Sequence, residues 1–187
     1  ALFRLPVALT PIQALAIDMG TDSLTALGLG AERPDPQAMR RPPRQRDQRL
    51  LDLPLALRAY LFLGTIEAAG AMSAFLFVLH HGGWRYGQMP GVDDPLYLQA
   101  TTAALCAIIV MQVVNVFLCR SPVRSVRATG FGGNRWILAG VALELALLAL
   151  FAYTPWGNAL LGTAPPPAGV WWCILGFASC MLILEEA

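Results

Sequence analysis

Residues 15–24 read LAIDMGTDSL and place two carboxylates, Asp18 and Asp22, inside an apolar segment from about residue 7 to residue 29. About 20 apolar residues suffice to cross a bilayer as a helix. Residues four apart share a helix face, so we expect both carboxylates, with Thr21 beside them, to point the same way. A carboxylate at bilayer depth is energetically costly and is usually kept for a function, most often cation binding. The sequence therefore predicts a cation site in this span.

The composition is that of a membrane protein. Of the 187 residues, 56% are hydrophobic and only 13% are charged, with a mean hydropathy of +0.55. Soluble domains carry about 25% charged residues. All thirteen basic residues are Arg, and eleven of them lie in residues 33–58 and 120–135. Because apolar spans flank both clusters, membrane topology explains them better than nucleic-acid binding does.

Hydropathy predicts a single all-α domain over residues 1–187, a bundle of five transmembrane helices. The expected spans are residues 7–29, 55–79, 97–118, 136–153 and 170–184. Small residues at helical spacing on the second span favour close packing on a neighbour. They are Gly64, Ala68, Gly70, Ala71 and Ala74.

The connecting loops alternate in charge. Loops 30–54 and 119–135 are rich in Arg, whereas residues 80–95 contain one Arg and residues 154–169 contain none. The positive-inside rule makes the two basic loops cytoplasmic in a multi-pass protein of the plasma or inner membrane. The N-terminus is then expected outside and the C-terminus in the cytoplasm. A chain that opens outside, without Met or a signal peptide, is expected to be an excised piece of a larger transporter.

Two motifs in succession resemble a known family. The Asp18-Met-Gly-Thr21-Asp22 run is followed by PDPQAMRRPPR at residues 34–44. Together they resemble the C-terminal membrane region of cation-transporting P-type ATPases, which include the calcium, sodium/potassium and proton/potassium pumps. Weaker similarities extend over MQVVNV at 111–116, GVALE at 140–144 and residues 171–186. By this resemblance the five spans are helices six to ten of a ten-helix pump.

The resemblance implies a set of ion ligands in this chain. The implied cation-binding residues are Asp18, Thr21, Asp22, Gln112 and Asn115, with Asp18 and Asp22 as the metal-ligating carboxylates. Glu144 matches an acidic position of the ninth helix near an additional sodium site. Glu67 and Glu144 are together a possible additional ion or proton site.

Three positions refine or weaken the resemblance. An Asp at position 18 resembles the sodium/potassium and proton/potassium branch of the family, because calcium pumps have Asn at this position. Asn115 stands where the sodium/potassium pump has an Asp, which weakens an additional sodium site. Thr25 replaces a Pro that the family usually has, which puts the local helix geometry in doubt.

The chemistry of these residues supports the same site independently. Sodium, potassium, calcium and hydronium all take oxygen ligands, which carboxylate, hydroxyl, amide and carbonyl groups supply. Gly20 permits local unwinding, which would free backbone carbonyls around a cavity. Structural alternatives stay open: Asp18 and Asp22 could cap a broken helix. The other polar groups, Glu67, Gln112, Asn115 and Glu144, could form hydrogen bonds between helices.

The favoured interpretation is the ion-binding and translocation domain of an ATP-driven cation pump. The phosphorylation motif Asp-Lys-Thr-Gly-Thr does not occur in the sequence. We therefore expect no catalytic residue and no cofactor in this chain, and Mg²⁺ and ATP to be used by the parent pump. The expected partners are the remaining helices and cytoplasmic domains of that pump and membrane lipid. A stand-alone channel or secondary transporter, and a non-transporting accessory or remnant subunit, are the alternatives.

Overall fold

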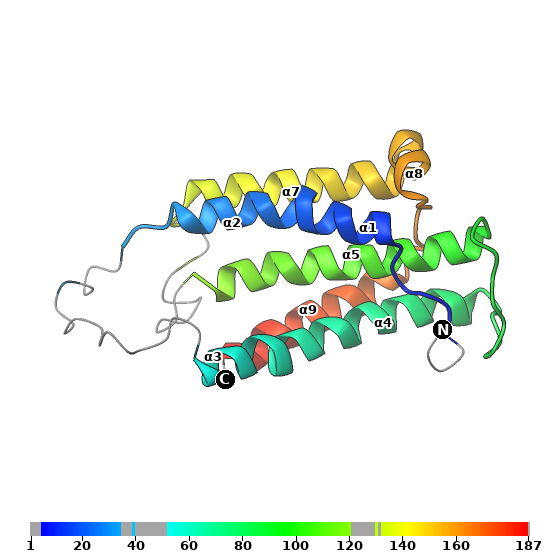
Figure 1. The fold of residues 1–187 in the computed structure, drawn as a ribbon, viewed down its shortest axis with the longest axis horizontal. Coiled ribbons are helices and arrows are strands. Elements are labelled where there is room, and N and C mark those ends of the chain that lie inside the picture. Colours follow the sequence, from blue (N-terminus) through cyan, green and yellow to red (C-terminus); the bar gives the residue numbers. More distant parts are fainter. Residues whose placement is uncertain (1–4, 35–38, 40–51, 121–129, 131, 187) are drawn as a thin grey trace.

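A computed structural model describes residues 5–34, 39, 52–120, 130 and 132–186, and their regular structure is entirely helical (Figure 1). The all-α prediction is confirmed. Two of the long helices are continuous rods in which a π-helical segment, labelled η, lies between α-helices. The helices are α1 (Pro11–Ala16), η2 (Ile17–Asp22), α2 (Ser23–Gly30), α3 (Leu53–Ala56), η4 (Leu57–Leu63), α4 (Gly64–His81), α5 (Pro95–Leu118), α7 (Arg135–Tyr153), α8 (Pro155–Leu161) and α9 (Val170–Glu186). The two rods are α1–η2–α2 and α3–η4–α4.

Short polar side chains determine where the rods begin. Such a side chain accepts a hydrogen bond from a first-turn N–H, and Pro often follows because its missing N–H costs nothing there. Thr10 and Gln13 form a capping box around Pro11, so the first rod begins at Pro11 and not near residue 7. The other capping residues are Asp52, Asp94, Asn134 and Thr154.

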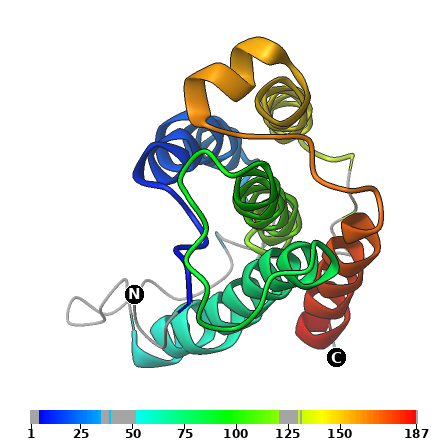
Figure 2. The same ribbon diagram turned by 90° about the vertical axis from the view of Figure 1, so that its right-hand side faces the viewer.

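The centre of the bundle is α5, which the other long helices surround (Figure 2). It contacts α4, α9, α7 and η2. Its buried face is rich in Ala, and small side chains let neighbouring backbones come close in a membrane, where dispersion forces hold helices together. The fully or almost fully buried alanines of this face are Ala100, Ala103, Ala104 and Ala107.

The close packing expected of the second span occurs on one side of α4. Gly70, Ala71 and Ala74 are buried, whereas Ala68 is exposed. A Cβ on Gly70 would lie 2.8 Å from Met111 Cε and 3.2 Å from Phe177 Cβ. Glycine at this position therefore allows α4, α5 and α9 to meet.

The ends of the helices agree with the expected alternation of loops. The C-terminal ends of α2 and α5 and the N-terminal ends of α3 and α7 all lie at the left of Figure 1. Loops 30–54 and 119–135 therefore connect at the same end of the bundle. Most of their residues, including the Arg cluster at 40–49, lie outside the described residues.

A short helix in the Pro-rich loop 154–169 was not expected. Thr154 Oγ1 accepts from Gly157 N at 3.1 Å and starts α8. The helix ends at Gly162, whose φ of +59° favours glycine. This loop is therefore folded onto the end of α7.

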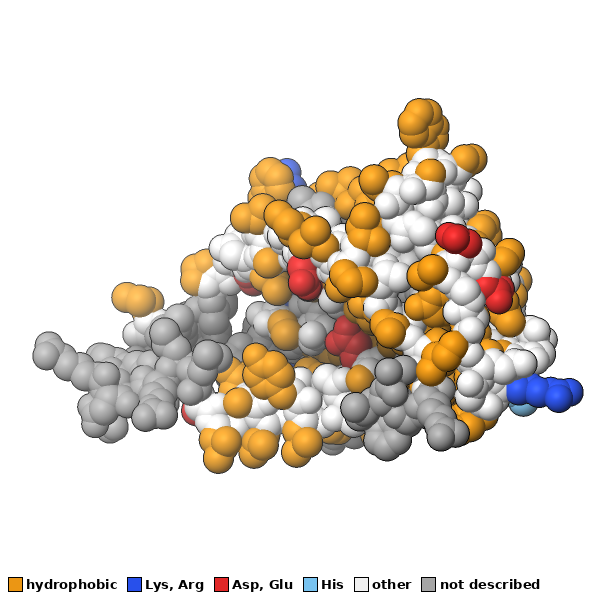
Figure 3. Space-filling view, turned by 45° about the vertical axis from the view of Figure 1, so that its right-hand side comes forward, with side chains coloured by type: hydrophobic (Ala, Val, Ile, Leu, Met, Phe, Trp, Pro, Cys, Tyr) orange, Lys and Arg blue, Asp and Glu red, His pale blue; other side chains and the backbone are white. Residues whose placement is uncertain are grey.

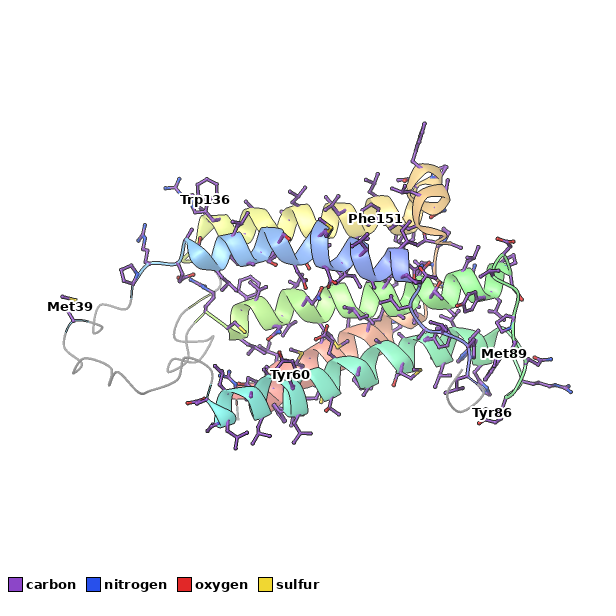
Figure 4. The ribbon with its side chains drawn as sticks, in the orientation of Figure 1. Met39, Tyr60, Tyr86, Met89, Trp136 and Phe151 are labelled. Carbon is purple, nitrogen blue, oxygen red and sulfur yellow. The ribbon has the colours of Figure 1, made fainter. Side chains whose placement is uncertain are left out.

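The surface and helix lengths match a membrane domain. In the described part of the chain, Leu53–His81, Pro95–Leu118 and Arg135–Tyr153 are long and apolar enough to cross a membrane, and Val170–Glu185 is a shorter apolar helix. Hydrophobic side chains cover much of the visible surface (Figure 3). Trp136 lies at one end of α7, while Tyr86 and Met89 lie at the opposite end of the bundle (Figure 4).

The contact between α2 and α7 can be tested at Gly28. A Cβ there would lie 3.0 Å from both the N and the Cα of Ile137, whereas one on Gly30 would meet no atom within 4 Å. We expect Gly28→Val to destabilise the domain by about 1–3 kcal/mol, because backbone atoms cannot move aside as a side chain can. Gly30→Val is the matched control and should have little effect. Equal thermal stability of the two variants in detergent would contradict this packing.

Candidate cation-binding site

The segment singled out in the sequence departs from α-helical geometry. Ile17–Asp22 is π-helical, with α-helix before and after it. Such π-helical segments are rare and frequently occur at functional sites. Two side chains bond to its carbonyls: Thr21 Oγ1 donates to Ile17 O at 2.8 Å and Ser23 Oγ to Asp18 O at 3.2 Å. Gly20 predicted local unwinding of this helix. In the structure the segment is instead π-helical and continues into α2 without a break.

One hydrogen bond joins two of the expected site residues across helices. Gln112 Nε2 on α5 donates to Asp22 Oδ2 at 3.2 Å. The other amide atom, Gln112 Oε1, is buried and has no hydrogen-bond partner among the described residues. An acceptor oxygen is therefore left unpaired beside a carboxylate, which suits a bound cation or proton donor.

The remaining expected ligands do not join this pair directly. Thr21 is fully buried and uses its hydroxyl hydrogen on Ile17 O. Asp18 is exposed, although its charge interacts with that of Asp22. Asn115 Oδ1 accepts from Cys119 Sγ at 3.5 Å. Within the described residues, no three His, Cys, Asp or Glu side chains are grouped closely enough to hold a metal ion.

Two further carboxylates approach Asp22 from other helices. Glu144 lies on the buried face of α7 with 0% of its surface exposed, and neither carboxyl oxygen has a partner in the described part of the chain. Glu67 on α4 is half-buried. Both interact electrostatically with Asp22. Since an unpaired polar group is costly to bury, Glu144 is a strong functional candidate.

Sequence reasoning missed a polar network at the end of the bundle where α2 stops. Arg120 donates from Nη2 to Glu32 Oε1 at 3.0 Å and from Nε to Oε2 at 3.1 Å, and its Nη1 also donates to Gly130 O. Asn134 Nδ2 donates to Glu32 Oε2 and to Gly28 O, both at 2.9 Å. The hydrogen bonds from Arg120 lower the pKa of Glu32, burial opposes this, and Asn134 reinforces it. The sequence pattern marks Arg120 only as part of the basic loop 119–135.

A second missed network lies at the opposite end, around Gln13. This side chain is fully buried, and its Nε2 donates to Thr101 Oγ1 at 3.4 Å and to the carbonyls of Leu161 and Gly162 at 3.5 and 3.4 Å. Its Oε1 accepts from Thr10 N at 3.2 Å. The sequence signal that could have revealed this network is Gln13 itself, an amide side chain within the apolar first span.

These features define an all-helical, membrane-spanning domain with polar groups at its centre. The family "Cation transporting ATPase, C-terminus" matches residues 6–187, and the chain belongs to this family. The resemblance expected from the sequence is thereby confirmed.

Two individual relatives, both named as transporting ATPases, match the chain along nearly its whole length. The chain is 33% identical to the "Probable cation-transporting ATPase F" of Mycobacterium tuberculosis over 174 residues, 93% of this chain and 18% of that protein. It is 26% identical to the human "Sodium/potassium-transporting ATPase subunit alpha-3" over 208 residues, 98% of this chain and 20% of that protein. The chain thus spans about a fifth of the length of the curated relatives it matches.

The Glu32–Arg120 pair makes stability depend on pH. Because the pKa of Glu32 is lowered on folding, its contribution is complete above the unfolded value of about 4.3 and is lost as the pH falls through the folded value. We expect Glu32→Ala to cost about 2 kcal/mol at pH 7, since the buried Arg120 guanidinium loses both of its bonds to a carboxylate and keeps the one to Gly130 O. Arg85→Ala, at an exposed Arg that does not act on Glu32, is the control. A stability difference between wild type and Glu32→Ala that does not shrink below pH 4.3 would contradict the ion pair.

The buried carboxyl group of Glu144 is expected to lower the free energy of unfolding of the domain. Replacing Glu144 with Leu removes two unpaired buried oxygens, and we expect a gain of about 1–3 kcal/mol in the free energy of unfolding in detergent. Leu148→Ala, one turn further along the same buried face, should cost about 2–5 kcal/mol and shows that the assay reports α7 packing. A loss of stability in Glu144→Leu would mean that the carboxyl has a stabilising partner.

Proposed function

We propose that this chain is the ion-binding and translocation domain of an ATP-driven cation pump, with Asp22 at the centre of the ion site. The supporting observation is the hydrogen bond between Asp22 and Gln112 at the end of the π-helix, in a member of the cation-transporting ATPase family. The bond brings the carboxylate of one helix to the amide of the central helix. It leaves Gln112 Oε1 free to bind a cation.

The proposed ligand set combines oxygens from several helices. Asp22 and Gln112 supply a carboxylate and an amide oxygen, and Thr21 and Asn115 lie within one turn of them along η2 and α5. Hard cations favour such mixed oxygen sites. Glu144 and Glu67 approach Asp22 from α7 and α4 and are proposed as an additional ion or proton site.

Asp18 is proposed to complete the site together with groups from outside this chain. It is exposed in this chain, and at bilayer depth an exposed carboxylate requires a partner. We propose that helices of the parent pump cover it and add the remaining ligands. A carboxylate at position 18 favours an alkali cation or a proton over calcium, by resemblance to the sodium/potassium and proton/potassium pumps.

The energy source is proposed to lie outside this chain. In the parent, ATP and Mg²⁺ would phosphorylate a cytoplasmic domain and switch the access of the carboxylates between the two sides of the membrane. The end of the bundle where α2 and α5 stop would face the cytoplasm, together with the C-terminus, and the N-terminus would lie outside. The Arg-rich loops would contact anionic lipid at that surface.

The test is ion-stimulated phosphorylation from ATP in the full-length pump, comparing wild type with Asp22→Asn in sodium, potassium, calcium and at low pH. We expect one ion to change phosphoenzyme formation or breakdown, and Asp22→Asn to weaken that response at least tenfold, because a charged ligand is lost. Asp52→Asn is the matched control: Asp52 is exposed and caps α3, and Asn preserves the cap. An Asp22→Asn variant that behaves like wild type would show that Asp22 is structural.

A further inference from the structure

The π-helix Ile17–Asp22 lies between the two polar networks that sequence reasoning missed. Gln13 precedes it in the same rod, and Gly28 and Glu32 follow it. Both networks connect this rod to other helices. The rod that carries the proposed ion ligands is therefore held at both ends.

The first anchor holds α1. Gln13 donates to Thr101 on α5 and to the carbonyls of Leu161 and Gly162 at the end of α8. The side chain is fully buried, so water cannot replace these bonds at low cost. The orientation of α1 about its own axis is thereby tied to α5 and α8.

The second anchor holds α2. Asn134 caps α7 through Oδ1, which accepts from Trp136 N at 2.9 Å, and its Nδ2 donates to Gly28 O and Glu32. Arg120 holds the same Glu32 from the end of α5. The close approach of Gly28 to the Ile137 backbone leaves α2 little room to turn.

Fixing both ends has a geometric consequence for the segment between them. A π-helical segment is equivalent to one residue inserted into an α-helix, and each α-helical residue turns the chain by about 100°. The segment can relax to α-helix only if α1 rotates by about that angle relative to α2. Two anchors that fix both orientations prevent this rotation.

We propose that Gln13 and Asn134 are positioning residues that hold the Ile17–Asp22 segment in its π-helical form and thereby keep Asp22 against Gln112. This proposal rests on the proposed function for its effect on ion affinity. The preservation of the π-helix itself does not depend on that function. Neither residue touches the ion in this arrangement, and each acts through the rotation of the rod.

The test separates the anchors from helix capping. Gln13→Met removes the cross-links of the first anchor together with the Gln13 half of the α1 capping box. Thr10→Ala is its control because it removes the other half of that box and none of the cross-links. Asn134→Ser removes the donors to Gly28 and Glu32 but keeps an oxygen that can cap α7. The double variant Gln13→Met/Asn134→Ser releases both ends. Should it fail to fold, the single variants carry the same test.

The first measurement is independent of ion transport. Spin labels at Met19→Cys and Leu143→Cys, two exposed positions, report the distance between the rod and α7 in the full-length pump after replacement of its other reactive cysteines. We expect the anchor variants to shift or broaden this distance, and Thr10→Ala to leave it unchanged. An unchanged distance in the anchor variants overturns the proposal.

The second measurement is the ion concentration for half-maximal phosphorylation. Groups that orient a ligand typically change ion affinity by 10–100-fold, so we expect a rise of about tenfold or more with the maximal phosphoenzyme level preserved. A shifted label distance with unchanged ion affinity in a responsive pump overturns the proposal as well. If wild type responds to no ion, the proposed function fails, and the label distance alone decides whether the anchors hold the segment.

Discussion

Polar groups at bilayer depth must be satisfied by protein, because the hydrocarbon region offers no water. This constraint organises the domain. The Asp22–Gln112 bond, the Gln13 network and the Asn134 network each join helices that are distant in sequence. Dispersion forces between small residues bring the helices together, and these polar contacts select one orientation for each.

The helix that carries Asp18 and Asp22 is one of two long helices around α5 that contain a π-helical segment. Asp22 at the end of its π-helix accepts a hydrogen bond from Gln112 on α5, while Asp18 is exposed. This asymmetry suits a domain that forms one side of an ion site. The chain accounts for about a fifth of each relative described above, and the exposed side of the rod is where further helices would add ligands.

Glu144 illustrates the conflict between stability and function. A carboxyl group with no surface exposed and no hydrogen-bond partner among the described residues lowers the stability of the domain. Proteins retain such costs mainly at functional sites. The nearby unpaired oxygen of Gln112 has the same character, and both lie around Asp22.

The sequence by itself determined the all-α class, the family and the approximate positions of the long helices, because hydrophobic length and capping residues such as Thr10 and Asp94 act locally. It also identified Asp22 and Gln112 as site candidates through their local motifs. It could not assign α5 to the centre, nor separate buried Ala71 from exposed Ala68, since both depend on which helix packs where. Only the tertiary structure decided that Arg120 binds Glu32 and that Gln13 reaches Gly162, because these contacts span 88 and 149 residues. The π-helix is likewise a feature that only the tertiary structure decides, because we propose that it depends on how other helices hold both ends of the rod.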